Sequence, residues 1–329
     1  MQDLYLLSCA PVSQGGGVYN YRLDAQGALE KRAFFPCDKP MYAVNDGDKL
    51  HILLRAPFEG NVAKNQNARN ADPKEEYSGY FTCKTDFSSP SEIKSTLGKC
   101  ACHLAADGGD VYIVNYLSGN VVKNCTVACV HEGKGVNLPR QDMPHTHFVS
   151  FSPDKQYVLC CDLGLDTIFV YDRNLNEISR AKVPPGHGVR HFVFSKDGQT
   201  VYAVNELIPS VSVFSFGGKT LTLKNTVLLP CEKQTSTAAA IRLSADETKL
   251  YVSVRGENAI FVLRAEGERL EIVQKASCGG DSPRDFNLFG DTLICCNESS
   301  DNVSVWKTKN GLLQKQVNTI YLKSPLCVL

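Results

Sequence analysis

The sequence predicts an all-β fold, a seven-bladed β-propeller, and three observations indicate it. One phrase recurs along the 329 residues: an apolar strand, a Ser/Ala-x-Asp-Gly turn, a second strand and a closing Asn or Asp. The copies follow one another at roughly the 40–50-residue repeat of a four-stranded propeller blade. The strand segments are rich in β-branched and aromatic residues, and no amphipathic helical pattern of any length is visible between them.

Six copies contain the first strand and its turn. They begin at Lys39, Cys100, His145, Val189, Ala239 and Pro283. In the first five copies the turn carries Asp46, Asp107, Asp154, Asp197 and Asp246, which are 61, 47, 43 and 49 residues apart. The first spacing is long because a polar segment, Ala56–Ser78, is inserted there, and we expect it to form a loop.

Further strands complete most copies. Third strands are predicted at Thr167–Tyr171, Ser210–Phe214, Ala259–Leu263 and Asn302–Trp306, and a fourth strand at Leu221–Leu229. Four strands in each copy are typical of propeller blades.

The two ends of the chain predict how the ring closes. The N-terminus begins directly with a second strand, Leu4–Ser8, which lacks a first strand of its own. The C-terminal segment Ser324–Leu329 resembles the first strand at Ser282–Phe286 and has no second strand after it. We therefore expect Leu326–Leu329 to complete the N-terminal blade, which makes seven blades and leaves no open sheet edge. The whole chain, residues 1–329, is predicted to be one domain.

The charge and hydropathy of the chain argue against several classes of protein. Lys plus Arg equals Asp plus Glu, at 35 each, and no dense Lys/Arg run occurs, which argues against nucleic-acid binding. Apolar residues make up 43% of the chain, which is enough for a large core. The longest apolar runs fall far short of the ~20 residues of a membrane span. The start of the chain has no basic region and carries Asp3, so we expect no secretory signal.

The cysteines predict a reducing environment. Among the 14 cysteines, Cys160–Cys161 and Cys295–Cys296 are adjacent within apolar strands, and neither a C-x-x-C pair nor a zinc-binding spacing occurs. Such cysteines behave as small apolar residues. We therefore expect reduced core cysteines and a cytoplasmic protein.

The register of the repeat predicts a functional site at one mouth of the central channel. The first strand of each blade lines the channel, and alignment on the turn Asp places His147, Arg190 and Ala239 at its start. Arg284 falls there too if its hairpin is shorter by two residues. The position after the second strand is occupied by Tyr116, Leu163, Glu206, Arg255 and Glu298. Residues far apart in sequence therefore converge on one mouth.

This set of residue types suits a small anionic substrate, because Arg binds phosphate or carboxylate through its planar fork. A His or Glu nearby can take a proton from water, and Arg can stabilise an oxyanion. We predict catalytic roles for His147, Glu206, Arg190 and Arg255, with Glu206 orienting the His147 imidazole or taking the proton itself. We predict substrate-binding roles for His145, Arg284 and Asn205, with His145 on the same strand face as His147 by the two-residue period. No metal and no cofactor are expected.

Structural interpretations of the same residues remain open. Glu206 and Arg255 could form an ion pair between blades. The recurring residues at the ends of second strands, Asn115, Asp162, Asn205 and Asn297, favour a turn-stabilising role. His131, His187 and His191 are weaker candidates, and His191 is expected to point into its blade, beside the channel-facing Arg190.

Several motifs resemble the propeller-type lactonase family, which includes the seven-bladed bacterial 6-phosphogluconolactonase and the fungal carboxy-cis,cis-muconate cyclising enzyme. The resemblance is carried by Arg140–His147, Asp162–Asp166, Pro185–His191, Val204–Leu207, Tyr251–Gly256 and Pro283–Phe286. It implies opening or closing of a sugar-acid lactone without a metal, with His147, Arg190, Glu206 and Arg255 as catalytic candidates. The chain departs from the family at Val189, where Pro is usual, and at Val254, where Asn is usual.

Three hypotheses of function follow. The first is hydrolysis of 6-phosphogluconolactone, or of another lactone, or a muconate-type cyclisation; the partner is then a small anionic lactone and the protein a monomer or weak homodimer. The second is a non-catalytic scaffold, although the blades lack the Gly-His and Trp-Asp signatures of WD40 repeats. The third is a metal-dependent lactonase, in which Asn115, Asp162, Asn205 and Asn297 would supply ligands.

Overall fold

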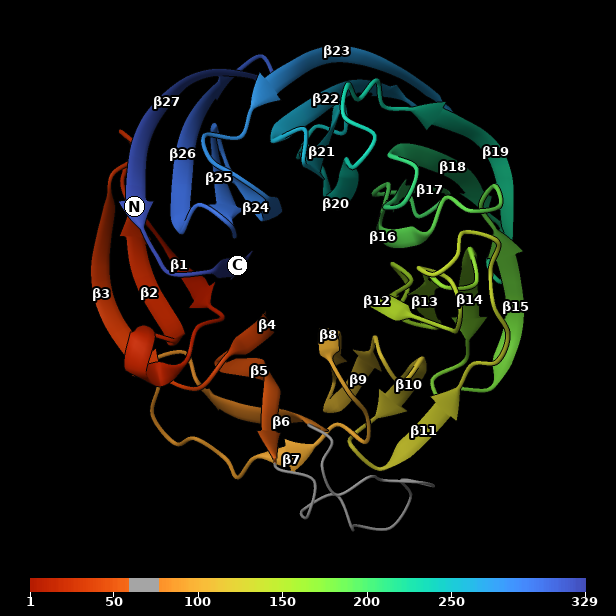
Figure 1. Ribbon diagram of the computed structural model, residues 1–329, viewed down its shortest axis with the longest axis horizontal. Coiled ribbons are helices and arrows are strands. Elements are labelled where there is room, and N and C mark those ends of the chain that lie inside the picture. Colours follow the sequence, from red (N-terminus) through yellow and green to blue (C-terminus); the bar gives the residue numbers. More distant parts are fainter. Residues whose placement is uncertain (59–76) are drawn as a thin grey trace.

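The computed structural model describes residues 1–58 and 77–329, which form seven four-stranded sheets arranged as blades around a central axis (Figure 1). Blade 1 contains β28 (Pro325–Val328), β1 (Gln2–Ser8), β2 (Gly17–Leu23) and β3 (Leu29–Pro36). Blade 2 contains β4 (Pro40–Asp46), β5 (Lys49–Phe58), β6 (Tyr77–Lys84) and β7 (Lys94–Ser95). Blade 3 contains β8 (Ala101–Asp107), β9 (Asp110–Asn115), β10 (Asn120–Lys123) and β11 (Val127–Val130).

The remaining four blades follow in chain order. Blade 4 contains β12 (Thr146–Phe151), β13 (Val158–Asp162), β14 (Thr167–Tyr171) and β15 (Glu177–Lys182). Blade 5 contains β16 (Val189–Phe194), β17 (Thr200–Asn205), β18 (Ser210–Phe216) and β19 (Leu221–Leu228). Blade 6 contains β20 (Thr237–Leu243), β21 (Lys249–Arg255), β22 (Ala259–Glu266) and β23 (Arg269–Ser277), and blade 7 contains β24 (Pro283–Phe289), β25 (Thr292–Asn297), β26 (Asn302–Lys309) and β27 (Leu312–Tyr321). The predicted seven-bladed propeller is confirmed.

The described chain contains very little helix. Within residues 1–58 and 77–329 the helical content is the 3₁₀ turn η1 (Val12–Gln14), and no helix there is long and apolar enough to cross a membrane. The predicted loop Ala56–Ser78 lies mostly outside the described residues, and its described ends belong to β5 and β6, not to a loop.

The ring closes through the last strand, as predicted. β28 pairs antiparallel with β1, with Leu6 opposite Val328 and Leu7 opposite Cys327. Tyr5 and Leu329 add two backbone hydrogen bonds, at 2.7 and 3.0 Å. The blue C-terminal strand consequently lies inside the red N-terminal strands in Figure 1. Blade 1 therefore depends on both ends of the chain.

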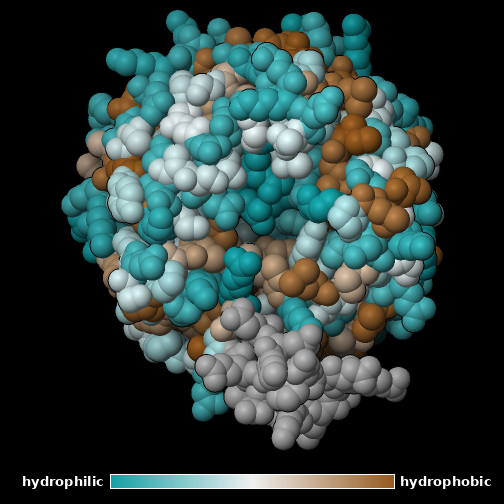
Figure 2. All heavy atoms as spheres, viewed as in Figure 1, coloured by the Kyte–Doolittle hydropathy of each residue, from teal (hydrophilic) through white to brown (hydrophobic). Residues whose placement is uncertain are grey.

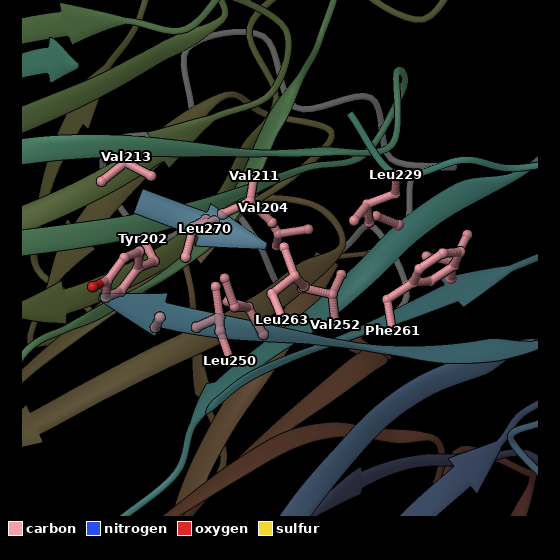
Figure 3. Packing of buried hydrophobic residues seen from close by; sticks show 14 of the residues in the cluster. Tyr202, Val204, Val211, Val213, Leu229, Leu250, Val252, Phe261, Leu263 and Leu270 are labelled. Carbon is pink, nitrogen blue, oxygen red and sulfur yellow. The ribbon is translucent and has the colours of Figure 1, made fainter. Parts of the chain in front are cut away.

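Apolar packing lies between the blades. Seven clusters of buried apolar side chains each join two neighbouring sheets. In the cluster of Figure 3, Val204 and Val211 of blade 5 pack against Leu250 and Val252 of blade 6. Full burial of such a side chain stabilises the fold by about 1.5–3 kcal/mol. All 14 cysteines are free, and none is exposed, which agrees with their predicted role as small core residues.

A β-bulge recurs near the start of every inner strand and decides which side chains face the axis. In six blades one residue is extruded from the pairing between the first and second strands, and in blade 6 two alanines are. The extruded residues are Met41, Cys102, His147, Arg190, Ala239, Ala240, Arg284 and Leu326. A bulge interrupts the two-residue alternation and re-aims a side chain. The position that the repeat register predicts at the start of each first strand, with His147, Arg190 and Ala239, is therefore the position of this bulge. Arg284 occupies it as expected.

Removal of Pro325–Leu329 should destabilise the whole propeller. Leu326, Cys327 and Val328 are all buried, and their loss removes several kcal/mol of apolar burial while exposing the edge of β1. We expect a lower midpoint in urea unfolding, with one cooperative transition that involves all blades. An unchanged midpoint would show that closure by β28 does not stabilise the ring.

Candidate active site

Two cavities lie along the axis at the end where the inner strands begin. The wide cavity has a volume of about 240 Å³ and is lined by Cys100, Cys102, Tyr116, Arg140, His147, Glu206, Thr237, Arg255 and Arg284. The narrow cavity offers about 20 Å³ and is lined by Met41, Tyr42, Cys102, His147, Arg190, His191, Arg284, Asp285 and Leu326. Cys102, His147 and Arg284 line both. A central hollow is visible on the face shown in Figure 2, with hydrophilic residues along its upper rim and more hydrophobic ones along its lower rim.

Glu206 is the centre of the polar cluster. Its Oε1 accepts a hydrogen bond from Arg140 at 2.7 Å. Its Oε2 accepts one from Nε of Arg190 at 2.9 Å and lies 3.1 Å from Nη2 of Arg255. Burial raises the pKa of Glu206, but Arg255 and Arg190 outweigh this, so the pKa lies well below the usual value of 4.5. Glu206 therefore stays ionised and holds three guanidinium groups in place.

Arg190 is fixed more firmly than the other arginines. In addition to its bond to Glu206, its Nη1 donates to the carbonyl of Ala239 at 2.8 Å and contacts Nε2 of His191 at 3.0 Å. The small residues at the blade 6 bulge leave this carbonyl accessible. Burial, together with Arg284 and Arg255, lowers the pKa of Arg190 to about 9, which leaves the guanidinium charged at neutral pH.

His147 lies at the junction of the two cavities and is neutral. Burial and Arg190 hold its pKa well below the usual value of 6.5. The ring packs edge-on against Tyr116 and lies 5.2 Å from the ring of His191. A neutral imidazole can accept a proton or donate one, depending on which nitrogen carries the hydrogen.

The structure brings together five of the predicted residues, His147, Arg190, Glu206, Arg255 and Arg284, and it gives Glu206 different partners from those expected. The sequence predicts that Glu206 orients the His147 imidazole or takes the proton itself. In the structure both Glu206 oxygens are engaged by arginines, and Nδ1 of His147 has no hydrogen-bond partner among the described residues. The ion-pair interpretation of Glu206 and Arg255 is the one that the geometry supports.

Two predicted substrate-binding residues lie outside both cavities. Asn205 is fully buried inside blade 5, where its amide donates to Ser210 and Ser212. His145 stacks on the ring of Tyr116 at 4.3 Å and bonds to its backbone oxygen. The bulge at His147 explains the difference, because it breaks the two-residue period by which His145 was expected to share the face of His147.

The same effect corrects the expectation for His191. The sequence predicts that His191 points into its blade, because consecutive strand residues face opposite ways. The bulge at Arg190 removes this alternation, so Arg190 and His191 both line the narrow cavity. The other two weaker candidates have partners elsewhere: His131 contacts Asp162 and Tyr171, and His187 contacts Ser210.

The recurring Asn and Asp residues join the second strand of their blade to the segment that precedes its first strand. Asn115 donates to the carbonyl of Thr96, and Asn297 to that of Cys278, while Asp162 accepts from the backbone of His145. These contacts support the turn-stabilising interpretation. In the part of the chain that the structure describes, no group of three or more His, Cys, Asp or Glu is arranged to hold a metal ion.

Sequence reasoning missed Arg140 and Tyr116 as site residues. Arg140 lies between β11 and β12, outside the repeated strands, so register alone cannot place it. Its side chain reaches Glu206 and Tyr116 although 45% of it is exposed. The segment is held by the buried Gln141, which donates to the carbonyl of Leu163 and to Asp166. Tyr116 occupies the register position of Glu206 and could have been found from it.

Fold and site together define a seven-bladed propeller with an arginine-rich axial cavity. The family model described as Lactonase, 7-bladed beta-propeller matches residues 5–329, and the chain belongs to this family. A Staphylococcus aureus protein of uncharacterized function (strain bovine RF122) is 33% identical over 325 residues, which cover 88% of this chain and 94% of that protein. A Staphylococcus saprophyticus protein, also uncharacterized, is 28% identical over 312 residues, 88% of this chain and 86% of its own.

Solved structures share the fold over almost the full chain. A candidate 6-phosphogluconolactonase from Bacteroides fragilis superposes with a TM-score of 0.85 at 22% identity, covering 99% of this chain and 97% of that one. The periplasmic gluconolactonase of Pseudomonas aeruginosa superposes with a TM-score of 0.83 at 24% identity, covering 99% and 98%. At these identities the likeness shows the fold.

Glu206→Gln should destabilise the protein at neutral pH, by about 3–5 kcal/mol, because it leaves buried guanidinium groups without a counter-charge. The folded-state pKa of Glu206 is lowered, so its stabilising effect is complete above pH 4.5 and is lost as the pH falls below that value. The difference in unfolding free energy between wild type and variant should therefore shrink below pH 4.5. Urea unfolding across this range measures it.

Glu298→Gln is the matched control. Glu298 has the same register position in blade 7, but it is 34% exposed and lies 3.8 Å from Arg284. We expect a change below about 1 kcal/mol. Equal effects of the two substitutions would contradict the central position of Glu206.

Proposed function

We propose that the protein hydrolyses the lactone of a phosphorylated sugar acid, with 6-phosphogluconolactone as the simplest substrate and 6-phosphogluconate as the product. The observation that carries the proposal is the charge of the site. Four guanidinium groups, of Arg140, Arg190, Arg255 and Arg284, are paired with only two carboxylates, Glu206 and Glu298. Two positive charges are left over for a ligand.

A phosphate monoester matches this excess. It carries a charge of about −1.5 to −2 at pH 7, and its oxygens accept the paired N–H groups of arginine. An unphosphorylated gluconolactone is neutral and would leave the excess uncompensated. A dicarboxylate, as in a muconate-type reaction, has a similar charge. Activity must therefore be compared on a phosphorylated lactone and on a dicarboxylate to separate these two substrate classes.

Proximity to His147 suggests how the substrate is oriented. His147 and Arg284 line both cavities, whereas Arg140 and Arg255 line only the wide one. We assign the lactone carbonyl to the junction beside His147 and Arg284, and the phosphate to the side of Arg140 and Arg255. We assign the oxyanion to Arg284 and not to Arg190, because Arg190 is engaged by Glu206, Ala239 and His191.

The reaction then proceeds in two steps. His147 takes a proton from water as the water oxygen attacks the lactone carbonyl carbon, and Arg284 stabilises the resulting oxyanion. The tetrahedral intermediate collapses, the bond between the carbonyl carbon and the ring oxygen breaks, and protonated His147 returns the proton to the leaving oxygen. The products are a free hydroxyl group and a carboxylic acid, which ionises at neutral pH.

Replacing His147 by Gln should lower turnover by roughly 10²–10⁴, measured above the spontaneous opening of the lactone. Because the pKa of His147 lies well below 6.5, the wild-type rate should stay level between pH 8 and 6.5 and fall only at lower pH. His187→Gln, at a histidine outside both cavities, should leave turnover unchanged. A near-wild-type rate for His147→Gln on every lactone tried would contradict the mechanism, and no activity in the wild type would favour a scaffold.

Arg140→Gln should selectively weaken the binding of the phosphorylated substrate. Loss of one charge-assisted hydrogen bond, about 1.5–3 kcal/mol, corresponds to a rise in KM of at least ~10-fold. The KM for gluconolactone should be unchanged. Arg55→Gln is the control for the loss of a positive charge alone. The backbone of Arg55 has the same register in blade 2 that Glu206 has in blade 5, so Arg55 lies at the same mouth of the channel. Arg55 does not line either cavity. Equal effects of both substitutions, or equal losses on both substrates, would contradict a direct phosphate contact.

A further inference from the structure

The narrow cavity beside His147 brings together ring nitrogens that no described protein group satisfies. Nδ1 of His147 and Nδ1 of His191 are both buried without a hydrogen-bond partner in residues 1–58 and 77–329. Both side chains line the narrow cavity, and each is less than 10% exposed. A buried polar atom left unpaired costs about 1–3 kcal/mol, so two such atoms on side chains that line one cavity point to a ligand there.

Arg190 determines where His191 carries its proton. Nη1 of Arg190 lies 3.0 Å from Nε2 of His191. A guanidinium group can only donate, so this nitrogen must be the unprotonated acceptor. Burial and Arg190 hold the pKa of His191 well below 6.5, so the ring is neutral and its single proton is on Nδ1. His191 thus presents an N–H donor to the narrow cavity.

Asp285 supplies the carboxylate of the same cavity. It is the only acidic residue among the side chains that line it in the described chain. Its position is fixed, because Oδ1 accepts from Arg242 at 2.8 Å and Oδ2 accepts from the backbone of Val328 at 3.2 Å. Carboxylate oxygens can accept further hydrogen bonds beyond these two.

The volume of the narrow cavity, about 20 Å³, suits one water molecule, which needs at least about 10–15 Å³ and two to four polar partners. We propose that a water bound here links His147 to Asp285, and that Asp285 is thereby the positioning residue of the His147 imidazole. The water accepts hydrogen bonds from Nδ1–H of His147 and from Nδ1–H of His191, and donates one to Asp285. All of its lone pairs are then used.

This arrangement leaves Nε2 of His147 unprotonated, as a general base requires. It resembles the His–Asp pair of a catalytic triad with one water inserted, in which the carboxylate fixes the tautomer of the imidazole. The base role of His147 rests on the proposed function, but the water and the tautomer do not. Glu206 does not serve in this way, because it lines the wide cavity and not the narrow one.

Nitrogen-15 NMR of histidine-labelled protein tests the proposal without any substrate. The signals of His147 among the seven histidines are assigned by their loss in His147→Gln. At neutral pH we expect the Nδ1–H tautomer of His147 in the wild type. Asp285→Asn keeps a carbonyl oxygen for Arg242 but turns the other acceptor into an N–H donor, and it should shift His147 toward the Nε2–H tautomer.

Two further variants separate the water bridge from general damage to the ion pair. Arg242→Gln breaks the same ion pair but leaves the carboxylate, and it should keep the Nδ1–H tautomer. Leu326→Phe adds bulk to the wall of the narrow cavity while leaving Asp285 unchanged, and it should produce the shift seen in Asp285→Asn. A lowered kcat, by about 10–100-fold with KM unchanged, should accompany the shift if the proposed function holds.

The outcomes distinguish the two proposals. An Nε2–H tautomer in the wild type, an unchanged tautomer in both Asp285→Asn and Leu326→Phe, or an equal shift in Arg242→Gln would overturn the water-bridged pair. The expected tautomers in a protein that opens no lactone would overturn only the proposed function.

Discussion

The site depends on one carboxylate bonded to three guanidinium groups. Glu206 is 5% exposed, and ion pairs from two blades and one connecting segment meet on it. Arginine side chains are long and flexible, so holding several of them at fixed positions costs side-chain entropy. A buried carboxylate supplies the fixed point and also reduces their mutual repulsion. Because it offsets only part of their charge, the ordered cluster keeps a net positive charge.

The propeller makes this cluster possible through two structural features. Apolar side chains are buried in clusters between the blades, and polar residues share the channel with Met41 and Leu326. The bulge in each inner strand then turns one residue per blade inward. Small residues at the blade 6 bulge leave a carbonyl for Arg190, and a histidine at the blade 4 bulge lies where the two cavities meet.

Most of the fold could be predicted from the sequence, because the repeat is regular and its turns share one Asp. The closure by Leu326–Leu329 and the register of Glu206, Arg255 and Arg284 followed from the same alignment. The directions in which the side chains of His145 and His191 point could not be predicted. A bulge has no sequence signature of its own, and it locally reverses the alternation of side chains along a strand. Arg140 was missed as a site residue since it lies between repeats, where register carries no information.

Binding calorimetry with the hydrolysis product tests most directly whether the arginine cluster is built for a doubly charged anion. 6-Phosphogluconate and gluconate differ only by the phosphate, and neither is turned over. If the excess charge around Glu206 binds phosphate, the wild-type protein should bind 6-phosphogluconate at least ~10-fold more tightly than gluconate, with an advantage that declines as salt is added. Equal affinities for the two compounds at low salt would contradict this.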